Sequence, residues 1–423
     1  MIKVTFCAHD APESVGGPVT WIQRLLPALR DYGIESRCLF LTYDGDSGPA
    51  LEALRKQGFD CPAVALPEYS EDRTRWILAR LEESPPDVFV ANLVVPAYFA
   101  ARWVKSVGIP TVGILHSDDE FYRGLQREFV FGRQEFRLSA LVCVSRALEQ
   151  QVVTGQPAGV IVRRIAYGVP VPTDRVARRP SGLRMVYVGR LAEQQKRISQ
   201  VTRGLCRIVR EVPGTDAVLY GDGPDKRCVE EILATDGAGL PVRLAGRVDS
   251  SHIQERLLNA DVIVLLSDYE GLPIAILEAM ACGCVPVCLR TRSGIAELIE
   301  DGVTGLLVDD RADGLVDALR RLQDEPGLWE RLSRAARARV ETSHANQACA
   351  QQWAELMREL YDDSGPRRRI TIPGRVQLPP VHPALACEDS RAPVPPRLSL
   401  RIASKSRGLA GQVKRRLLGR VVH

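Results

Sequence analysis

The sequence of 423 residues predicts an α/β protein with two doubly wound parallel-sheet domains that face a cleft. Short apolar runs alternate with amphipathic stretches, which is the pattern of βα units around a parallel sheet. This alternation occurs in two consecutive blocks, and residues 166–182, rich in Pro, Gly and Arg, lie between them as a linker. Because single cores stop growing beyond about 250–300 residues, a chain of this length is expected to form two domains.

The first block, residues 1–170, is predicted to be the N-terminal domain of this pair. It begins with an apolar strand at Ile2–Phe6, followed by a Gly-containing loop and a helix from Thr20 to about Tyr32. The later apolar runs are short enough to be buried strands, and they lie at 38–41, 88–91, 111–115 and 141–144. The N-terminus lacks a long apolar signal segment, so we expect a cytoplasmic protein.

The second block, residues 171–345, repeats the alternation and is predicted to bind the ligand. Its expected strands lie at 185–188, 217–221, 242–246, 262–267 and 285–289. A helix over 346–363 follows, and we expect it to pack back against the N-terminal domain. Eleven cysteines without a repeated spacing, including Cys282 and Cys284, favour reduced and mostly buried thiols rather than a metal or redox centre.

The C-terminal tail, residues 364–423, differs in charge from the rest of the chain. It carries 13 Lys/Arg and 2 Asp/Glu, whereas the first 363 residues carry 43 and 50, respectively. Its Pro and Arg content predicts disorder to about Pro396, and residues 398–423 have the pattern of a basic amphipathic helix. Such a segment attracts anionic membrane surfaces, so we expect a peripheral protein on the inner face of a membrane.

Ligands of doubly wound sheets bind beyond the carboxyl ends of the strands, so the loops that follow strands carry the candidate site residues. After the first strand come Gly16 and Gly17, which allow backbone N–H groups at a helix start to approach phosphate; the alternative is a flexible turn. After residues 111–115 comes His116, which is placed to contact a substrate hydroxyl or transfer a proton. A structural histidine that caps the loop is the alternative. The adjacent Asp118-Asp119 pair is common in turns, and we expect no metal there.

The loop after residues 185–188 contains Gly189, Arg190 and Lys196. Arg offers a planar fork of donors to phosphate oxygens, and Lys adds a mobile point charge. Both lie at the mouth of a strand, where a diphosphate would contact them. The alternative is a solvated helix start with incidental charges.

The segment "DYEGLPIAILEAMACGCVPV", residues 268–287, places Glu270 and Glu278 eight positions apart. Pro273 suits a helix start and Gly283 a helix end, so Glu270 precedes the helix and Glu278 lies within it. Eight helical steps would rise about 12 Å, comparable with the span from ribose to sugar in a nucleotide sugar. The alternative for Glu278 is a structural ion pair with an Arg.

The motifs "VGRL…QKR", "GDGP", "EGLPIAILEAMACGCVPV" and "SGIAELIEDGVTGLLV" together resemble the family-4 retaining glycosyltransferases of GT-B fold. The resemblance spans about residues 1–361 and is strongest in the second domain. It implies two Rossmann-like domains, a nucleoside-diphosphate-sugar donor with UDP or GDP favoured, no further cofactor and no metal. It also implies a glycan or glycolipid acceptor in cell-surface polysaccharide assembly, with residues 1–170 as the acceptor-side domain, while nucleic acid is not an expected partner.

The resemblance implies roles for the charged residues of the second domain. Arg190 and Lys196, with Gly189 in the same loop, neutralise the donor diphosphate and stabilise the departing nucleotide. Glu278 binds the ribose hydroxyls, and Glu270 positions the transferred sugar rather than acting as a covalent nucleophile. The backbone N–H groups that complete the sugar contact belong to Gly271, Leu272 and Ile274.

The remaining implied roles concern the first domain and the nucleotide base. His116 is the histidine near the reacting carbon of the sugar, and Gly16 and Gly17 form the loop that closes over the phosphates. Arg247 and Val248 follow a strand at the position where the family holds the base. The sequence departs from the common pattern at Lys196, one position further from the Arg, and at Arg197, which replaces a glycine.

Other classes agree less well with these residues. A nucleotide-sugar epimerase of the same fold would need further acidic residues in the cleft, and a phosphorylase would need a pyridoxal-phosphate lysine. A dinucleotide oxidoreductase would need a full G-x-G-x-x-G after the first strand, which is absent. A membrane- or nucleic-acid-binding protein acting through the basic tail would leave the cleft residues unexplained.

Overall fold

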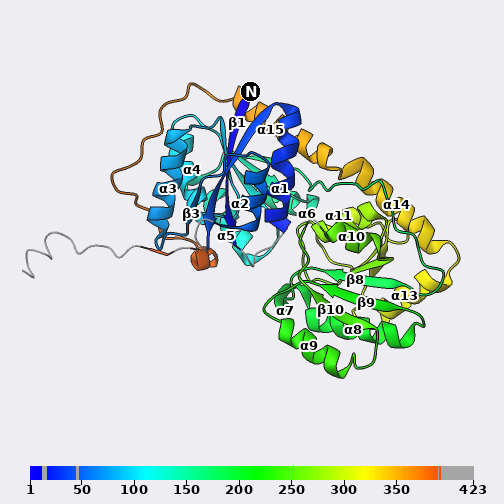
Figure 1. Cartoon of the computed structure of the whole chain (residues 1–423). Helices are drawn as coiled ribbons and strands as arrows, with labels where there is room; N and C mark the ends of the chain where they lie inside the picture. Colours follow the sequence, from blue (N-terminus) through cyan, green and yellow to red (C-terminus); the bar gives the residue numbers. More distant parts are fainter. Residues whose placement is uncertain (12–16, 44–46, 251, 389, 392–423) are drawn as a thin grey trace, which may run out of the picture.

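The computed structural model describes residues 1–11, 17–43, 47–250, 252–388 and 390–391. Two α/β domains follow one another along the chain, the first in blue to cyan and the second in green to yellow (Figure 1). Each is built on its own parallel sheet with helices on both faces. This confirms the predicted pair of doubly wound domains.

The N-terminal sheet has seven parallel strands in the order β3-β2-β1-β4-β5-β6-β7. The strands are β1 Ile2–Asp10, β2 Ile34–Thr42, β3 Ala63–Ala65, β4 Val88–Ala91, β5 Thr111–Leu115, β6 Ala140–Cys143 and β7 Ile161–Arg164. The sequence pattern revealed the central strands but missed β3 and β7. These two are the edges of the sheet, where half-exposed residues, including two arginines in β7, replace a continuous apolar run.

Helices cover both faces of the N-terminal sheet and supply most of its apolar core. They are α1 Gly17–Leu29, η1 Arg30–Tyr32, α2 Pro49–Lys56, α3 Ser70–Glu83, α4 Val95–Ser106, α5 Glu120–Phe129, η2 Gln134–Phe136 and α6 Arg146–Thr154. Strands β4 and β5 are buried at every position, as expected for parallel strands covered on both faces. Each α-helix here follows a strand of the sheet, which directs its N-terminus toward the strands' carboxyl ends.

The C-terminal sheet has six parallel strands in the order β10-β9-β8-β11-β12-β13. Its strands are β8 Arg184–Val188, β9 Asp216–Tyr220, β10 Val242–Gly246, β11 Val262–Leu265, β12 Val285–Leu289 and β13 Leu306–Val308. Its helices are α7 Glu193–Lys196, α8 Ile198–Glu211, α9 Lys226–Thr235, α10 Ile253–Leu258, α11 Ile274–Cys282, α12 Ile295–Leu298, α13 Asp313–Asp324 and α14 Leu328–Ser343.

The strand order reverses at one place in each sheet, between β1 and β4 and between β8 and β11. Connections on the two sides of such a point leave in opposite directions and open a crevice at the carboxyl ends of the strands. In the C-terminal sheet, Met185 and Val186 of β8 pair with Val262 and Ile263 of β11. The loops after β8 and β11 therefore emerge side by side, and they are the loops that carry the predicted charged residues.

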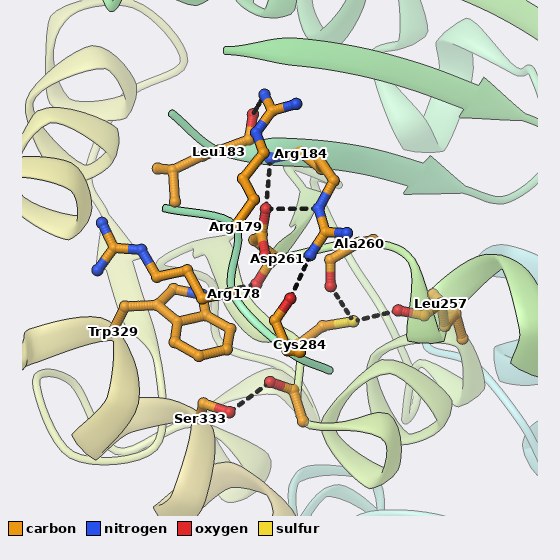
Figure 2. Close-up of polar contacts among 12 residues, drawn as sticks. Arg178, Arg179, Leu183, Arg184, Leu257, Ala260, Asp261, Cys284, Trp329 and Ser333 are labelled. Carbon is orange, nitrogen blue, oxygen red and sulfur yellow. Dashed lines mark hydrogen bonds and ion pairs between the residues drawn. The ribbon is translucent and has the colours of Figure 1, made fainter. Parts of the chain in front are cut away.

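The opposite ends of β8 and β11 are joined by a buried ion pair (Figure 2). Arg184 donates from Nε and Nη2 to the two carboxylate oxygens of Asp261, at 2.9 and 2.6 Å, and its backbone N–H donates at 2.7 Å. Asp261 is fully buried, and its carbonyl accepts from the Trp329 indole at 2.9 Å. The Cys284 thiol is also buried and lies 3.1 Å from the Leu257 carbonyl oxygen, in agreement with a structural thiol.

The chain returns to the N-terminal domain through α15, Asn346–Asp362, where the sequence places a helix over 346–363. This helix packs against α1, and the ring of Trp353 lies 5.4 Å from that of Trp21. The Asn346 amide donates to the Arg24 carbonyl at 3.3 Å, which fastens the start of α15 to α1. One helix thus links the two domains in addition to the linker.

Residues 364–388 and 390–391 form a surface strap along the N-terminal domain, visible as the orange and brown segment of Figure 1. Arg367 pairs with Asp87, and the Arg75 guanidinium donates to the Gly374 carbonyl at 3.0 Å. The short helix η3, Pro383–Glu388, packs on α5.

The sequence predicts disorder from Ser364 to about Pro396, whereas this strap is held by ion pairs and by three buried apolar side chains, Ile370, Val376 and Leu385. Widely spaced anchors of this kind carry no periodic signal in the sequence. The helix expected over 398–423 lies outside the described residues. No helix in the described part of the chain is long and apolar enough to cross a membrane.

Candidate functional site

The loops after β8 and β11 are tied together by their backbones and side chains. The Asp268 N–H donates to the Gln195 carbonyl at 2.9 Å, and the Gln195 amide donates to the Tyr269 carbonyl at 2.9 Å. These bonds set the one-turn helix α7 against the entry to α11. The predicted residues on the two loops are therefore held in one place by the fold.

Lys196 and Glu270 form an ion pair across these two loops. Their side chains are 14% and 8% exposed, so the pair is largely withdrawn from water. A carboxylate buried to this extent requires a charged or hydrogen-bonding partner, and the Lys196 ammonium is that partner. The structure thus brings together the predicted phosphate-binding lysine and the predicted sugar-positioning glutamate.

Arg197 occupies the position at which the family pattern has a glycine. Its backbone adopts the left-handed conformation, with φ +49° and ψ +46°, between α7 and α8. A non-glycine residue costs about 1–2 kcal/mol there. Its guanidinium donates to Asp268 at 2.6 Å, and Arg311 pairs with the other oxygen of the same carboxylate. The side chain of Arg197 thereby offsets part of the cost of its own backbone conformation.

Arg190 extends from the same loop and is exposed. Its carbonyl accepts from the Tyr187 hydroxyl at 2.8 Å, which fixes the backbone, and among the described residues its guanidinium forms no ion pair. Gly189 donates to the Tyr220 carbonyl at 3.1 Å, and a Cβ at Gly221 would overlap the Gly189 carbonyl. The loop is therefore rigid at its backbone, while its terminal cation is available to a ligand.

Helix α11 begins at Ile274 and ends at Cys282, and the next residue, Gly283, caps it with a φ of +90° that suits a glycine. Gly271 lies in the preceding loop, and a Cβ there would overlap the backbone carbonyl of His116 in the other domain. Within the described part of the chain, the N–H groups of Gly271, Leu272 and Ile274 donate to no other residue. Donors at a helix start that lack partners are suited to a ligand oxygen, as predicted for these three residues.

Glu278 lies in α11 and forms an ion pair with Arg24 of α1, across the two domains. The two side chains are 12% and 15% exposed, respectively. The alternative of a structural Glu paired to an Arg therefore has its partner in the structure. Pairing does not exclude a ligand, because a carboxylate offers about four lone-pair sites and Arg24 Nη2 occupies one.

His116 is buried, and both of its ring nitrogens have partners. Nε2 lies 2.5 Å from Asn92 Oδ1, and Nδ1 lies against the Tyr167 hydroxyl. Since Asn92 Oδ1 only accepts, the ring carries its proton on Nε2 and accepts from Tyr167 at Nδ1. Burial lowers the pKa of His116 to about 3, because it disfavours the charged imidazolium. The ring is thus neutral, and its role at the sugar stays a prediction.

The two predicted glycines of the first loop differ in what can be said of them. Gly16 lies outside the described residues. Gly17 is the first residue of α1, and a Cβ there would lie 3.3 Å from Ile274 Cδ1. The start of α1 therefore lies against the start of α11, and a larger residue at Gly17 would press on the domain interface.

Arg247 and Val248 line a cavity of about 430 Å³ beyond the end of β10. Tyr220 at the end of β9 and Arg243 of β10 itself contribute to the same cavity. Gly246, just before the loop, has a φ of +75°, which turns the chain at the mouth of the cavity. The structure thus provides a concave site at the two positions predicted to hold the base.

The acidic pair after β5 has structural roles. Asp119 caps α5 by accepting from the Tyr122 N–H at 3.2 Å, and Asp118 pairs with Arg123 at 3.1 Å. Among the described residues, no group of three or more His, Cys, Asp or Glu is arranged to hold a metal ion.

Sequence reasoning missed three residues of this region: Arg24, Asn92 and Tyr167. Asn92 follows β4 directly, so the rule that directed attention to strand ends would also have identified it. Arg24 lies seven positions after Gly17 on α1, and this spacing places both on one helix face. Tyr167 lies in the linker, where no pattern indicated a contact with His116.

Both domains of the chain match known protein families. Residues 15–169 match the family described as Glycosyltransferase Family 4, and residues 175–339 match Glycosyl transferases group 1. The two matches cover both domains, so the site belongs to a GT-B protein. The chain is a member of the family-4 glycosyltransferases.

Individual relatives match more partially. The chain is 30% identical over 177 residues to the alpha-D-kanosaminyltransferase of Streptomyces kanamyceticus, covering 42% of this chain and 45% of that protein. It is 26% identical over 300 residues to a GDP-mannose-dependent alpha-(1-6)-phosphatidylinositol dimannoside mannosyltransferase of Mycobacterium tuberculosis, covering 65% and 75%. Anabaena Alr3699/HepE in complex with UDP-glucose superposes with a TM-score of 0.67 at 18% identity, covering 85% of this chain and 100% of that chain, which shows the fold.

Proposed function

We propose that the protein transfers a sugar from a nucleoside-diphosphate sugar to a glycan or glycolipid acceptor, with retention of the anomeric configuration and without a metal ion. The observation that carries the proposal is the placement of Arg190, Lys196 and Glu270 on two adjacent loops at the switch point of the C-terminal sheet. Two cations and a carboxylate at such a crevice suit a diphosphate joined to a hydroxylated sugar.

The chemistry follows from the charge that develops on the leaving group. The bond between the anomeric carbon and the diphosphate oxygen breaks while the acceptor oxygen forms a bond to the same carbon on the same face. The acceptor proton passes to a phosphate oxygen of the leaving nucleotide. Arg190 and Lys196 stabilise the growing negative charge on the phosphate, as preorganised donors do in oxyanion holes. Glu270 and the amides at the start of α11 hold the sugar in the reactive orientation.

The comparisons indicate which donors and acceptors to test first. The names of the relatives include a GDP-mannose-dependent enzyme, and one superposed structure contains UDP-glucose, so UDP and GDP are the first bases to test. The acceptor proposed is a glycan or glycolipid of the cell surface, in line with the phosphatidylinositol dimannoside named for one relative. Residues 392–423 carry eight Lys/Arg and no Asp/Glu, which suits attraction to an anionic membrane on its cytoplasmic side.

The test is a screen of UDP-, GDP- and ADP-sugars for binding and hydrolysis, with and without EDTA. One donor should bind more tightly than its free nucleotide, and EDTA should leave turnover unchanged. Lys196→Ala and Arg190→Ala should each lower kcat about 10²–10³-fold. Arg227→Ala, which removes an exposed cation from α9, is the matched control and should behave as wild type. Intact transfer in Lys196→Ala, or binding of no nucleotide sugar, would contradict the proposal.

A further inference from the structure

The ion pair between Arg24 and Glu278 leaves one nitrogen of the guanidinium without a hydrogen bond. Nη2 of Arg24 donates to Glu278 Oε1, whereas Nη1 is buried and has no hydrogen-bond partner among the described residues. A buried charged donor without an acceptor is costly, and native structures rarely retain one without a reason. Its position beside the predicted ribose carboxylate indicates that the missing acceptor belongs to a ligand.

The backbone around Arg24 is held by contacts with α15 and α11. Its carbonyl accepts from Asn346 at the start of α15, and the first residue of α1, Gly17, lies against Ile274 at the start of α11. The guanidinium therefore reaches Glu278 from a helix that is held at both domains. This rigidity makes its second nitrogen a defined donor at the domain interface.

Resting on the proposed nucleotide-sugar donor, we propose that Arg24 is the N-terminal domain's contribution to the ribose subsite. A ribose hydroxyl both donates and accepts, so one hydroxyl can donate to the Glu278 carboxylate and accept from Arg24 Nη1. The Glu278 carboxylate can only accept hydrogen bonds from the ribose hydroxyls, so by itself it leaves their oxygens without a donor. The pair supplies both halves, and it does so only when the two domains are closed upon each other.

Arg24 is thus a positioning residue that couples nucleotide binding to contact between the domains. If Arg24 contacts only the ribose, its effect on binding differs from that of an arginine that contacts the phosphates. Substitution of Arg24 should leave the affinity for nucleotides that lack the 2′ and 3′ hydroxyls unchanged and should lower the affinity for nucleotides that carry them. A merely structural arginine would affect both kinds of nucleotide alike.

The experiment titrates UDP, GDP and ADP into the full chain and takes the tightest ligand together with its 2′,3′-dideoxy form. Wild type should bind the ribose form at least about tenfold more tightly, and Arg24→Ala should remove most of this preference while leaving the affinity for the dideoxy form unchanged. Arg24→Lys, which keeps the charge but not the fork, should fall between them. Arg164→Ala, which breaks another interdomain ion pair, of 2.8 Å to Glu297, is the control and should keep the preference.

Three results would overturn the proposal. Equal binding of the ribose and dideoxy forms by wild type would do so without any variant. An Arg24→Ala chain that keeps the preference, or that loses affinity for both forms equally, would do so as well. If the wild-type chain binds none of the three nucleotides, the result would instead count against the proposed function. If Arg24→Ala does not fold, the wild-type comparison and Arg24→Lys still decide the question.

Discussion

Acidification from pH 7.5 to 5 is a direct test of the way in which His116 is held. Its pKa is lowered to about 3 by burial, and its neutral ring donates to Asn92 and accepts from Tyr167. In the unfolded chain the same ring has a pKa near 6.5. The folded state therefore excludes a proton that the unfolded state binds, and stability is lost as the pH falls below about 6.5.

The size of the effect follows from these two pKa values. At pH 5 the unfolded ring is almost fully protonated and the folded ring is not, which lowers the free energy of unfolding by about 2 kcal/mol for His116. His344, whose pKa burial lowers to about 4, should contribute about 2 kcal/mol more at the same pH. Both side chains are less than a tenth exposed, so solvent screening reduces these values little.

Imidazole NMR of the full chain would read the pKa of His116 directly, with His116→Gln to assign its resonance. Its chemical shift should stay constant from pH 7.5 to 5. Hydrogen exchange in β5 should give an opening free energy that falls over this range in wild type and falls by about 2 kcal/mol less in His116→Gln. A His116 resonance that titrates near pH 6.5 would refute the account of a buried, neutral ring with hydrogen bonds at both nitrogens.

Three further predictions concern the framework of the site. Asp261→Ala should lower the free energy of unfolding by about 3–5 kcal/mol in urea titrations, because it leaves the Arg184 guanidinium without its buried partner, whereas the exposed Asp301→Ala should cost less than about 1 kcal/mol. Truncation after residue 391 should leave the melting temperature unchanged and weaken binding to anionic liposomes. Truncation after residue 363 should also lower the melting temperature, because it removes the buried side chains of Ile370, Val376 and Leu385. Unchanged liposome binding would contradict the membrane proposal. Arg197→Gly should be about 1 kcal/mol more stable than Arg197→Ala in the same urea titrations, since only the glycine relieves the left-handed backbone; equal stability would contradict this reading.

The sequence was informative where function depends on position along one strand and its loop. Lys196 and Glu270 meet because β8 and β11 are neighbours at a switch point, and the alternation of βα units already implied that neighbourhood. Arg24 could not be found in the same way, because its contact with Glu278 depends on how two separate domains close. Tyr167 was hidden for a related reason, since a linker residue has no periodic pattern to reveal which side chain it contacts.

The charges of the site also explain how its two carboxylates can be largely buried. Each predicted donor-binding carboxylate already has a cation, Lys196 for Glu270 and Arg24 for Glu278. Under the proposed function, a nucleotide sugar would bring phosphate oxygens for the cations and hydroxyls for the carboxylates, so its binding would leave no charge without a partner. Arg190, which forms no ion pair within the described residues, leaves these five groups with one net positive charge. That excess suits an anionic ligand better than a neutral sugar, so under the proposed function we expect Arg190 to contribute to selection for the diphosphate.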